Sequence, residues 1–138
     1  GLSLSRTDIL MRFGQKAYML ACRGDKIIGL AGWQVENLIA RTDEFLVAAD
    51  APIERTVKSL LESIEKASNE LQAEISLVFL KNGTSDGIRR AVLTSGYDPQ
   101  EPADLNVPDW REAAEETQPA NTYLVVKRLR AGRVLKPV

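Results

Sequence analysis

The clearest periodic pattern in the chain lies between residues 53 and 71, where apolar side chains recur every three or four positions. These positions are Ile53, Val57, Leu60, Leu61, Ile64, Ala67 and Leu71, and charged residues occupy many of the places between them. Such spacing puts the apolar side chains on one face of an α-helix. Pro52 precedes the pattern, and proline is favoured in the first turn of a helix. We therefore predict a long amphipathic helix over residues 53–71.

Compact apolar runs before this helix predict three strands. The predicted strands are residues 17–23, 26–34 and 41–49. The dipeptide Gly24-Asp25 separates the first two runs and is typical of a tight hairpin turn. Residues 36–40 form the next connection, which is also short. Short connections join antiparallel neighbours, so this part of the chain predicts an antiparallel meander.

Strands and a second helix are predicted after the long helix. The predicted elements are a strand at 73–80, a helix at 86–94 that ends at Gly96, and a strand at 121–129. The 53–71 helix can serve as the crossover that parallel strands require. We therefore predict an α/β fold with a mixed, twisted sheet flanked by helices.

Two further segments complete the predicted order of elements. Residues 98–117 form an acidic, proline-bearing excursion, with a helical turn predicted at 109–116. A short helix is predicted near the beginning of the sequence, with Ile9, Leu10 and Phe13 on one side and Gly14 at its end.

Composition narrows the classes of protein that fit. The chain has 138 residues, of which 44% are apolar and 27% charged, so we expect a single globular domain over residues 1–138. No apolar run approaches the roughly 20 residues that span a bilayer, and the first residues lack the layout of a secretory signal. Cys22 is the only cysteine, which favours a reducing, cytoplasmic setting and a small buried side chain at that position. Histidine is absent, which excludes histidine-based triads and the common zinc sites.

Charge is distributed unevenly although the net charge is only −1. Residues 98–117 hold seven acidic residues against the single Arg111, whereas residues 127–136 hold five basic residues and no acid. Aromatic residues do not interleave with the basic stretch, so nucleic-acid binding is not expected. The two patches are expected to be solvated, facing one another or a neighbouring segment.

Two short motifs carry a resemblance to a known family. Residues 26–31 (Lys-Ile-Ile-Gly-Leu-Ala) resemble the "G-x-x-V-G" strands of that family, and residues 94–99 (Thr-Ser-Gly-Tyr-Asp-Pro) resemble its "L-G-F-x-P" motif. Together with the order of the predicted elements, residues 17–129 resemble the GNAT superfamily of acyl-CoA N-acyltransferases. The resemblance implies the fold of that family, and we expect its first strand and part of its first helical pair to be missing from this sequence.

The family's cofactor loop is altered in this sequence. In the family, a strand ending V-x-P is followed by [RQ]-x-x-G-x-[GA], where glycines let the backbone approach the CoA pyrophosphate. The match places Val47 and Ala49 at the V and P positions, but Pro52, Arg55 and Val57 at the Arg/Gln, glycine and small positions. We therefore predict a degenerate loop in which Arg55 and Val57 place bulk near the phosphates.

The resemblance also implies which residues would hold a cofactor. If CoA binds, the implied residues are Val47, Ala49, Arg55, Thr56, Val57 and Lys58. Arg55 and Lys58 could bind phosphate through their side chains, since both are charged donors near the beginning of a helix.

A proton donor is missing at the expected place. Many members of the family carry a tyrosine that protonates the departing thiolate, and its L-Y pair corresponds here to Ala91 and Val92. Neither side chain can donate a proton. Tyr97 stands at the family's phenylalanine position, where core packing with an exposed hydroxyl is expected.

A general base would have to be a carboxylate near the central strand. Glu44 is the first candidate because it faces away from Phe45 and Val47, and Asp43 and Glu36 are the other two. Each is alternatively a solvated surface charge. Trp33 is either a wall of an acceptor pocket or a half-buried strand residue.

Three hypotheses of function follow. The first is a catalytically degenerate GNAT-like module that regulates or binds a protein partner, a neighbouring domain or a second copy of itself. The second is an active N-acetyltransferase that moves an acetyl group from acetyl-CoA to an amine, with Glu44 as base. The third is a small-molecule sensor with a cleft between the strands of Val47 and Ile75. The sequence establishes no cofactor, and acetyl-CoA or CoA is the candidate.

Overall fold

A computed structural model describes residues 16–130 of the chain. Its elements in order are β1 (Ala17–Arg23), β2 (Lys26–Glu36), β3 (Ile39–Val47), α1 (Ile53–Glu70), β4 (Ile75–Lys81), α2 (Asp86–Thr94), β5 (Asp98–Gln100), the 3-10 helix η1 (Pro102–Asp104), α3 (Pro108–Thr117) and β6 (Thr122–Arg128). The helix predicted near residues 7–13 and most of the basic stretch at 127–136 lie outside the described residues.

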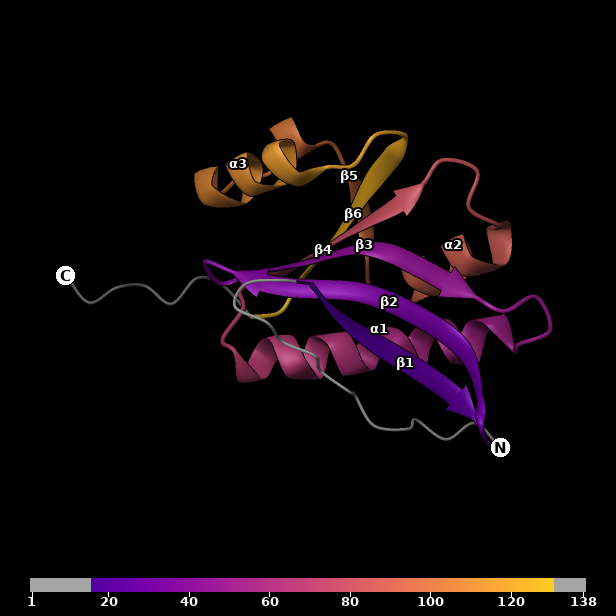
Figure 1. Cartoon of the computed structure of the whole chain (residues 1–138). Coiled ribbons are helices and arrows are strands. Elements are labelled where there is room, and N and C mark those ends of the chain that lie inside the picture. Colours follow the sequence, from indigo (N-terminus) through magenta and orange to yellow (C-terminus); the bar gives the residue numbers. More distant parts are fainter. Residues whose placement is uncertain (1–15, 131–138) are drawn as a thin grey trace.

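The strands of the described chain form one mixed sheet in the order β1-β2-β3-β4-β6-β5. β1, β2 and β3 are antiparallel neighbours, β3 and β4 are parallel, and β6 pairs antiparallel with both β4 and β5. Helices α1 and α2 lie on one face of this sheet, and α3 lies on the other (Figure 1). The predicted mixed sheet with helices on its faces is confirmed.

Helix α1 forms because its apolar stripe is buried against the sheet. Val57, Leu60, Leu61 and Ile64 are fully buried. The helix lies close to β2, because a Cβ atom at Gly29 would be only 2.6 Å from Cγ2 of Thr56. A larger residue at position 29 would push the beginning of α1 away from the sheet, and the beginning of α1 is also one boundary of the candidate site.

Strand β4 lies at the centre of the sheet and is covered on both faces. Leu77 and Phe79 pack toward α3 with Trp110, whereas Val78 and Leu80 pack toward α1 and α2. Six of its seven residues are buried, which explains why its sequence is a continuous apolar run rather than an alternating one.

The acidic excursion is more structured than the sequence indicated. Residues 98–117 contain β5, η1 and a full helix α3 that begins at Pro108, where a single helical turn was predicted. Only Trp110 and Ala114 of α3 are buried, so the helix carries too few apolar positions to give a strong periodic pattern. The seven acidic residues therefore lie on an ordered part of the fold.

Two further expectations are wrong. Cys22 is half-buried, because it lies near the end of the edge strand β1. Trp33 is only 1% exposed, and its indole nitrogen donates a hydrogen bond to Oγ of Ser68 at 2.8 Å. Trp33 therefore anchors α1 to β2 and walls no acceptor pocket.

Candidate functional site between β3 and β4

The two parallel strands, β3 and β4, are paired along only part of their length. Residues 39–42 of β3 pair with residues 75–78 of β4, and the pairing stops there. Beyond that point β3 stays paired with β2, and β4 stays paired with β6. In Figure 1 the two arrows diverge toward the side on which α2 lies. A cleft therefore opens within the sheet.

The cleft holds a cavity of about 510 Å³, within the range of small-molecule sites. Its lining comes from both strands, the turn after β4 and the first half of α2: Asp43, Glu44, Phe45, Leu46, Val47, Phe79, Leu80, Lys81, Asn82, Gly83, Thr84 and Ile88. The lining combines apolar side chains with three charged ones. A ligand with an apolar body and a few polar groups would suit such a wall.

A β-bulge in β3 places two carboxylates together beside the cavity. Gly32 pairs with Glu44 and Trp33 pairs with Thr42, so Asp43 is the extra residue. Nζ of Lys16 lies 2.9 Å from Oδ1 of Asp43 and 2.8 Å from Oε1 of Glu44. The three side chains are 28%, 32% and 41% exposed, respectively. One ammonium group therefore holds both carboxylates at the cleft.

This arrangement affects the protonation of Lys16. Burial lowers the pKa of Lys16, but its hydrogen bonds and charge interactions with Glu44 and Asp43 outweigh that effect and raise the pKa to about 12. Lys16 is therefore a cation at neutral pH. Glu44 lies at the cleft wall as predicted, yet a lone pair that a general base would need is occupied by this cation.

The third carboxylate considered as a base lies elsewhere. Glu36 ends β2 and pairs with Arg41, with 3.4 Å between Oε2 and Nη2. Both residues line a separate cavity of about 350 Å³ against α3, whose lining also includes Asp109, Glu112 and Glu116. Glu36 is therefore not brought to the cleft.

Charged residues at the beginning of α1 are paired within the chain. Oδ2 of Asp50 accepts a hydrogen bond of 2.7 Å from Nζ of Lys26, and this bond holds the pKa of Asp50 below its usual value. Oε1 of Glu54 lies 3.0 Å from Nζ of Lys58. Lys58 is thus engaged by a carboxylate, whereas the side chain of Arg55 is exposed. Two acidic side chains flank the place where phosphates would meet the helix.

Two predicted cofactor residues point into the protein. Thr56 and Val57 are both 0% exposed, and Val57 packs in the core with Leu61 and Val78. The prediction that Val57 places bulk beside the phosphates is wrong, because helical geometry turns this position toward the sheet. Val47 is half-buried at the cleft and Ala49 is exposed in the turn.

The backbone amides in the first turn of α1 have few partners. No side chain caps α1 within the described chain, and the first bond of the helix runs from the amide of Thr56 to the carbonyl of Pro52 at 3.0 Å. Amides in the first turn of a helix have no partner inside the helix. The amides of residues 53–55 therefore have no partner within the helix, and Glu54 is the acidic residue of this first turn.

The positions that correspond to the family's proton donor are in the core. Ala91 is 2% exposed and Val92 is 0% exposed, and both pack between α2 and the sheet. Neither can donate a proton, in agreement with the sequence analysis.

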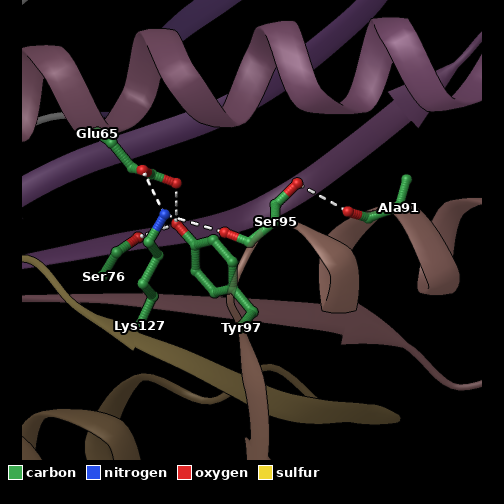
Figure 2. Close-up of polar contacts among 6 residues, drawn as sticks. All are labelled: Glu65, Ser76, Ala91, Ser95, Tyr97 and Lys127. Atoms are coloured by element: carbon green, nitrogen blue, oxygen red, sulfur yellow. Dashed lines mark hydrogen bonds and ion pairs between the residues drawn. The ribbon is translucent and has the colours of Figure 1, made fainter.

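Tyr97 was expected to expose its hydroxyl group, and this expectation is wrong. The residue is 1% exposed, and its hydroxyl lies 2.8 Å from Oγ of Ser76 and donates to Oε2 of Glu65 at 3.2 Å. Nζ of Lys127 donates to Oε1 of Glu65 at 2.8 Å and to the carbonyl of Ser95 at 2.9 Å. Figure 2 shows these groups converging from α1, β4, β6 and the end of α2.

This cluster of Glu65, Ser76, Tyr97, Lys127 and Ser95, which we name the Tyr97 network, has a structural role. Burial raises the pKa of Tyr97, so the hydroxyl keeps its proton and acts as a hydrogen-bond donor. Oγ of Ser95 also donates to the carbonyl of Ala91 at 2.7 Å, which closes the end of α2 (Figure 2). The network joins four elements away from the cleft.

A second tyrosine lies closer to the cleft. Tyr123 of β6 is opposite Leu80, which lines the cavity. Its hydroxyl is buried and has no hydrogen-bond partner among the described residues. Burial raises the pKa of Tyr123, and the nearby Arg89 partly offsets the effect.

The sequence analysis missed Lys16, Gly32, Tyr123 and the Tyr97 network. A lysine just before an apolar strand carries no signal, because its partners lie two strands away. The bulge that brings Asp43 and Glu44 together depends on register, which the pattern of apolar residues does not reveal.

Metal and membrane features were also considered. Among residues 16–130 no group of three acidic or cysteine residues could hold a metal ion. No helix in the described part of the chain is long and apolar enough to cross a membrane.

Comparison with known proteins shows a clear likeness of structure. No protein-family model matches the sequence, and no curated protein matches it by sequence. Among solved structures, the chain is similar to a GNAT-family acetyltransferase from Staphylococcus aureus Mu50, with a TM-score of 0.67 and 13% identity, over 85% of this chain and 70% of that one.

Coenzyme A is present in several of the similar structures, of which two serve as examples. One is the PaiA N-acetyltransferase from Thermoplasma acidophilum, with a TM-score of 0.61, 11% identity, and coverage of 83% of this chain and 61% of that one. The other is a Bacillus subtilis acetyltransferase, with a TM-score of 0.61, 13% identity, and coverage of 84% and 78%. At these identities the likeness concerns the fold, and the described chain has the GNAT fold that its motifs suggested.

Proposed function

We propose that this chain is a GNAT-fold domain that does not transfer acyl groups and that acts as a regulatory or interaction module. One observation carries the proposal: among the described residues, the carboxylates beside the cleft are paired with Lys16, and alanine and valine stand at the positions of the family's proton donor. The positions of the family's proton donor are Ala91 and Val92, both in the core. The candidate base Glu44 is held by the ammonium group of Lys16.

The beginning of α1 supports the same proposal. Phosphate binding at a helix N-terminus relies on free amides and on an absence of nearby negative charge. Here Glu54 stands in the first turn and Asp50 stands two residues before Pro52, and each is paired with a lysine, Lys58 and Lys26 respectively. The side chain of Arg55 is exposed, and a single exposed arginine contributes little in water.

Release of CoA thiol from acetyl-CoA tests this proposal. The protein is incubated with acetyl-CoA and a panel of primary amines, and free thiol is measured over time. We expect the rate with the protein to equal the rate in buffer, and the same for Glu44→Gln. Amine-dependent thiol release that Glu44→Gln abolishes would refute the proposal and establish the enzyme.

An active N-acetyltransferase is the second candidate, and two observations favour it. The cleft is open, with a cavity of about 510 Å³, and several similar structures are described as complexes with CoA. Tyr123 lies opposite a cleft residue and has a buried hydroxyl without a partner among the described residues. In this candidate Tyr123 protonates the thiolate, and Tyr123→Phe should lower turnover by about a hundredfold or more, the usual contribution of a general acid.

A small-molecule sensor is the third candidate. The apolar part of the cleft lining, which includes Phe45, Leu46 and Ile88, would suit a ligand without phosphates. Ligand-induced stabilisation in thermal unfolding, without thiol release, would favour the sensor over the enzyme.

The interaction role requires a protein partner, a neighbouring domain or a second copy. Ile27 and Leu46 support it, since they are 54% and 56% exposed on adjoining strands of the meander. Light scattering over a range of concentrations measures self-association, which Leu46→Lys should abolish if this surface is used. The single cysteine, Cys22, fits a reducing, cytoplasmic setting, which is part of the same proposal.

A further inference from the structure

The two edge strands of the sheet differ in how well they are protected against pairing with another chain. Strand β5 has only three residues, all exposed, and one of them is Pro99. A short edge strand with a proline pairs poorly with a further strand. Strand β1 has seven residues and no proline, and its residues 17–22 carry no charge. Among residues 16–130 it pairs with β2 alone, on the outer side of the sheet (Figure 1). The β1 edge therefore lacks the features that prevent pairing.

The two cations at the ends of β1 are balanced by carboxylates of the same chain. Lys16, which precedes the strand, binds the two carboxylates beside the cleft. Arg23, which ends the strand, lies within electrostatic range of Asp50, whose pKa is lowered mainly by Lys26 and further by the charge of Arg23. Positive charge on an edge strand normally repels a second strand. Because these charges are balanced locally, that repulsion is weakened here.

The outer face of β1 and β2 is not covered by a helix of the described chain. Alternate residues of β1 from Ala17 to Ala21 are buried against α1, so Leu20 faces the other side of the sheet. The core beneath α3 contains residues of β3, β4 and β6 but none of β1 or β2. Leu20 pairs with Leu30, and Leu30 pairs with Leu46, so the three leucines form a row across the strands. A strand added beside β1 would extend this row.

A second copy of β1 is a suitable strand for this edge. Antiparallel pairing of residues 17–23 with themselves includes all seven residues only when Leu20 lies opposite Leu20 of the second copy. In that register Met19 lies opposite Ala21, and Tyr18 lies opposite Cys22, so a large side chain meets a small one in each pair. No two like charges lie opposite each other. Apolar cross-strand pairs of this kind stabilise antiparallel strands.

We propose that β1 pairs antiparallel with β1 of a second copy of this chain, about a two-fold axis at Leu20, so that the two sheets become one. The inference rests on the interaction role proposed above and identifies its partner. A two-fold contact of a surface with itself closes at the dimer, and it does not propagate into a filament. The interface is one strand wide, so we expect a weak dimer with a dissociation constant on the order of 10 µM.

Sedimentation velocity over a range of concentrations tests the proposal with two lysine substitutions. Leu20→Lys puts two ammonium groups side by side at the axis, and we expect it to weaken the dimer at least about tenfold, because opposed like charges are costly in an interface. Leu46→Lys is the matched control. Leu46 is 56% exposed on the same face but lies two strands away from the edge, so this variant should dimerise like the wild type. Circular dichroism checks that each variant is folded.

Disulfide cross-linking tests the register independently of affinity. In a Cys22→Ser background, Leu20→Cys places two thiols opposite each other at the axis, within reach of a disulfide. Leu93→Cys in the same background is the control, since Leu93 is 39% exposed on α2. Under mild oxidation the Leu20→Cys protein should form a covalent dimer faster than the Leu93→Cys protein at every concentration.

Three results would overturn the proposal. They are a wild type that stays monomeric up to about 1 mM, a folded Leu20→Lys variant that dimerises as well as Leu46→Lys, and cross-linking through position 20 no faster than through position 93. A dimer that only Leu46→Lys weakens would assign the contact to the open face and not to the edge, which also contradicts the proposal. Thiol release from acetyl-CoA is a separate assay, so failure of this interface and failure of the proposed loss of catalysis are distinguishable.

Discussion

Strand β4 pairs along its whole length with β6 but only along part of its length with β3. Between β4 and β6 seven residue pairs run the whole length of β4, and the Tyr97 network ties that junction to α1. Between β3 and β4 only four pairs form before the strands diverge. Each junction has a lysine bound to carboxylate, Lys127 at the first and Lys16 at the second.

The carboxylate partners of the two lysines differ in how far they are buried. Glu65, the partner of Lys127, is 17% exposed, and the Tyr97 hydroxyl beside it is buried. Glu44, the partner of Lys16, is 41% exposed and borders a cavity. A polar cluster that is buried and fully bonded stabilises one conformation. A polar cluster at a cavity wall can exchange partners, which makes it the place to look for ligand binding.

Substitution at Tyr97 should have the largest effect on stability. Tyr97→Phe removes the hydroxyl that bonds Ser76 and Glu65, and a buried group left without a partner costs about 2 kcal/mol. Urea denaturation of the purified variant measures the change in unfolding free energy. Tyr123→Phe is the matched control, because its hydroxyl has no partner among the described residues and its loss should be nearly neutral. Equal losses in both variants would show that the Tyr97 network contributes nothing specific.

Adding a methyl group between α1 and β2, in Gly29→Ala, should lower the free energy of unfolding by less. Gly29→Ala places a Cβ atom 2.6 Å from Cγ2 of Thr56 and 3.0 Å from Cδ1 of Leu60. Thr56 is fully buried and β-branched, so its Cγ2 cannot move far without the backbone of α1, and we expect a loss of about 1 to 2 kcal/mol, within the range of overpacking costs. The measurement is again urea denaturation. In Gly32→Ala the short contact is with Cδ of the flexible Lys16 side chain, and the contacts with Asp43 and Glu44 are 3.4 Å, so this variant should cost less; a reversed order would contradict the described packing of α1.

Removal of the Lys16 charge should have the smallest effect on stability. Its ion pairs are partly exposed, so Lys16→Met should cost less than about 1 kcal/mol at neutral pH. The folded-state pKa of Lys16 is raised from 10.5 to about 12, so between neutral pH and pH 10.5 its ion pairs stabilise the fold fully, and they lose their effect as the pH rises through 12. The difference in melting temperature between wild type and variant should therefore be constant from neutral pH to pH 10.5 and disappear toward pH 12. A difference that grew with pH would have the wrong sign.

Much of the fold was predictable because local patterns agreed with the final packing. Strand 17–23 and helix 86–94 have the predicted bounds, and α1 ends within one residue of the prediction. In each of these elements the apolar period matches the buried face, and Gly24 and Gly96 have the positive φ that ends a strand or a helix. Helix α3 was underestimated because only two of its residues are buried.

The site was less predictable than the fold. Glu44 lines the cleft cavity, but its neighbours Asp43, Phe45, Leu46 and Val47 do too, so strand alternation does not single it out. The inward orientation of Val57 could have been inferred from the same helical period that placed Leu61 and Ile64 in the core. The pairing of Lys16 with Asp43 and Glu44 could not, because it depends on strand order, on the register of β2 with β3 and on a bulge.

The cleft is open in this fold, while the carboxylates at its wall and at the start of α1 are paired with lysines of the chain. The most direct test compares the affinity of CoA with that of pantetheine, which lacks the nucleotide and all phosphates, by calorimetry. If the phosphates gain no favourable contact near Asp50 and Glu54, the two dissociation constants should agree within about threefold. A tenfold difference would mean that the phosphates contribute about 1.4 kcal/mol to binding. Binding of CoA more than about tenfold tighter than pantetheine would contradict the claim, because it would show that the first turn of α1 still binds the diphosphate.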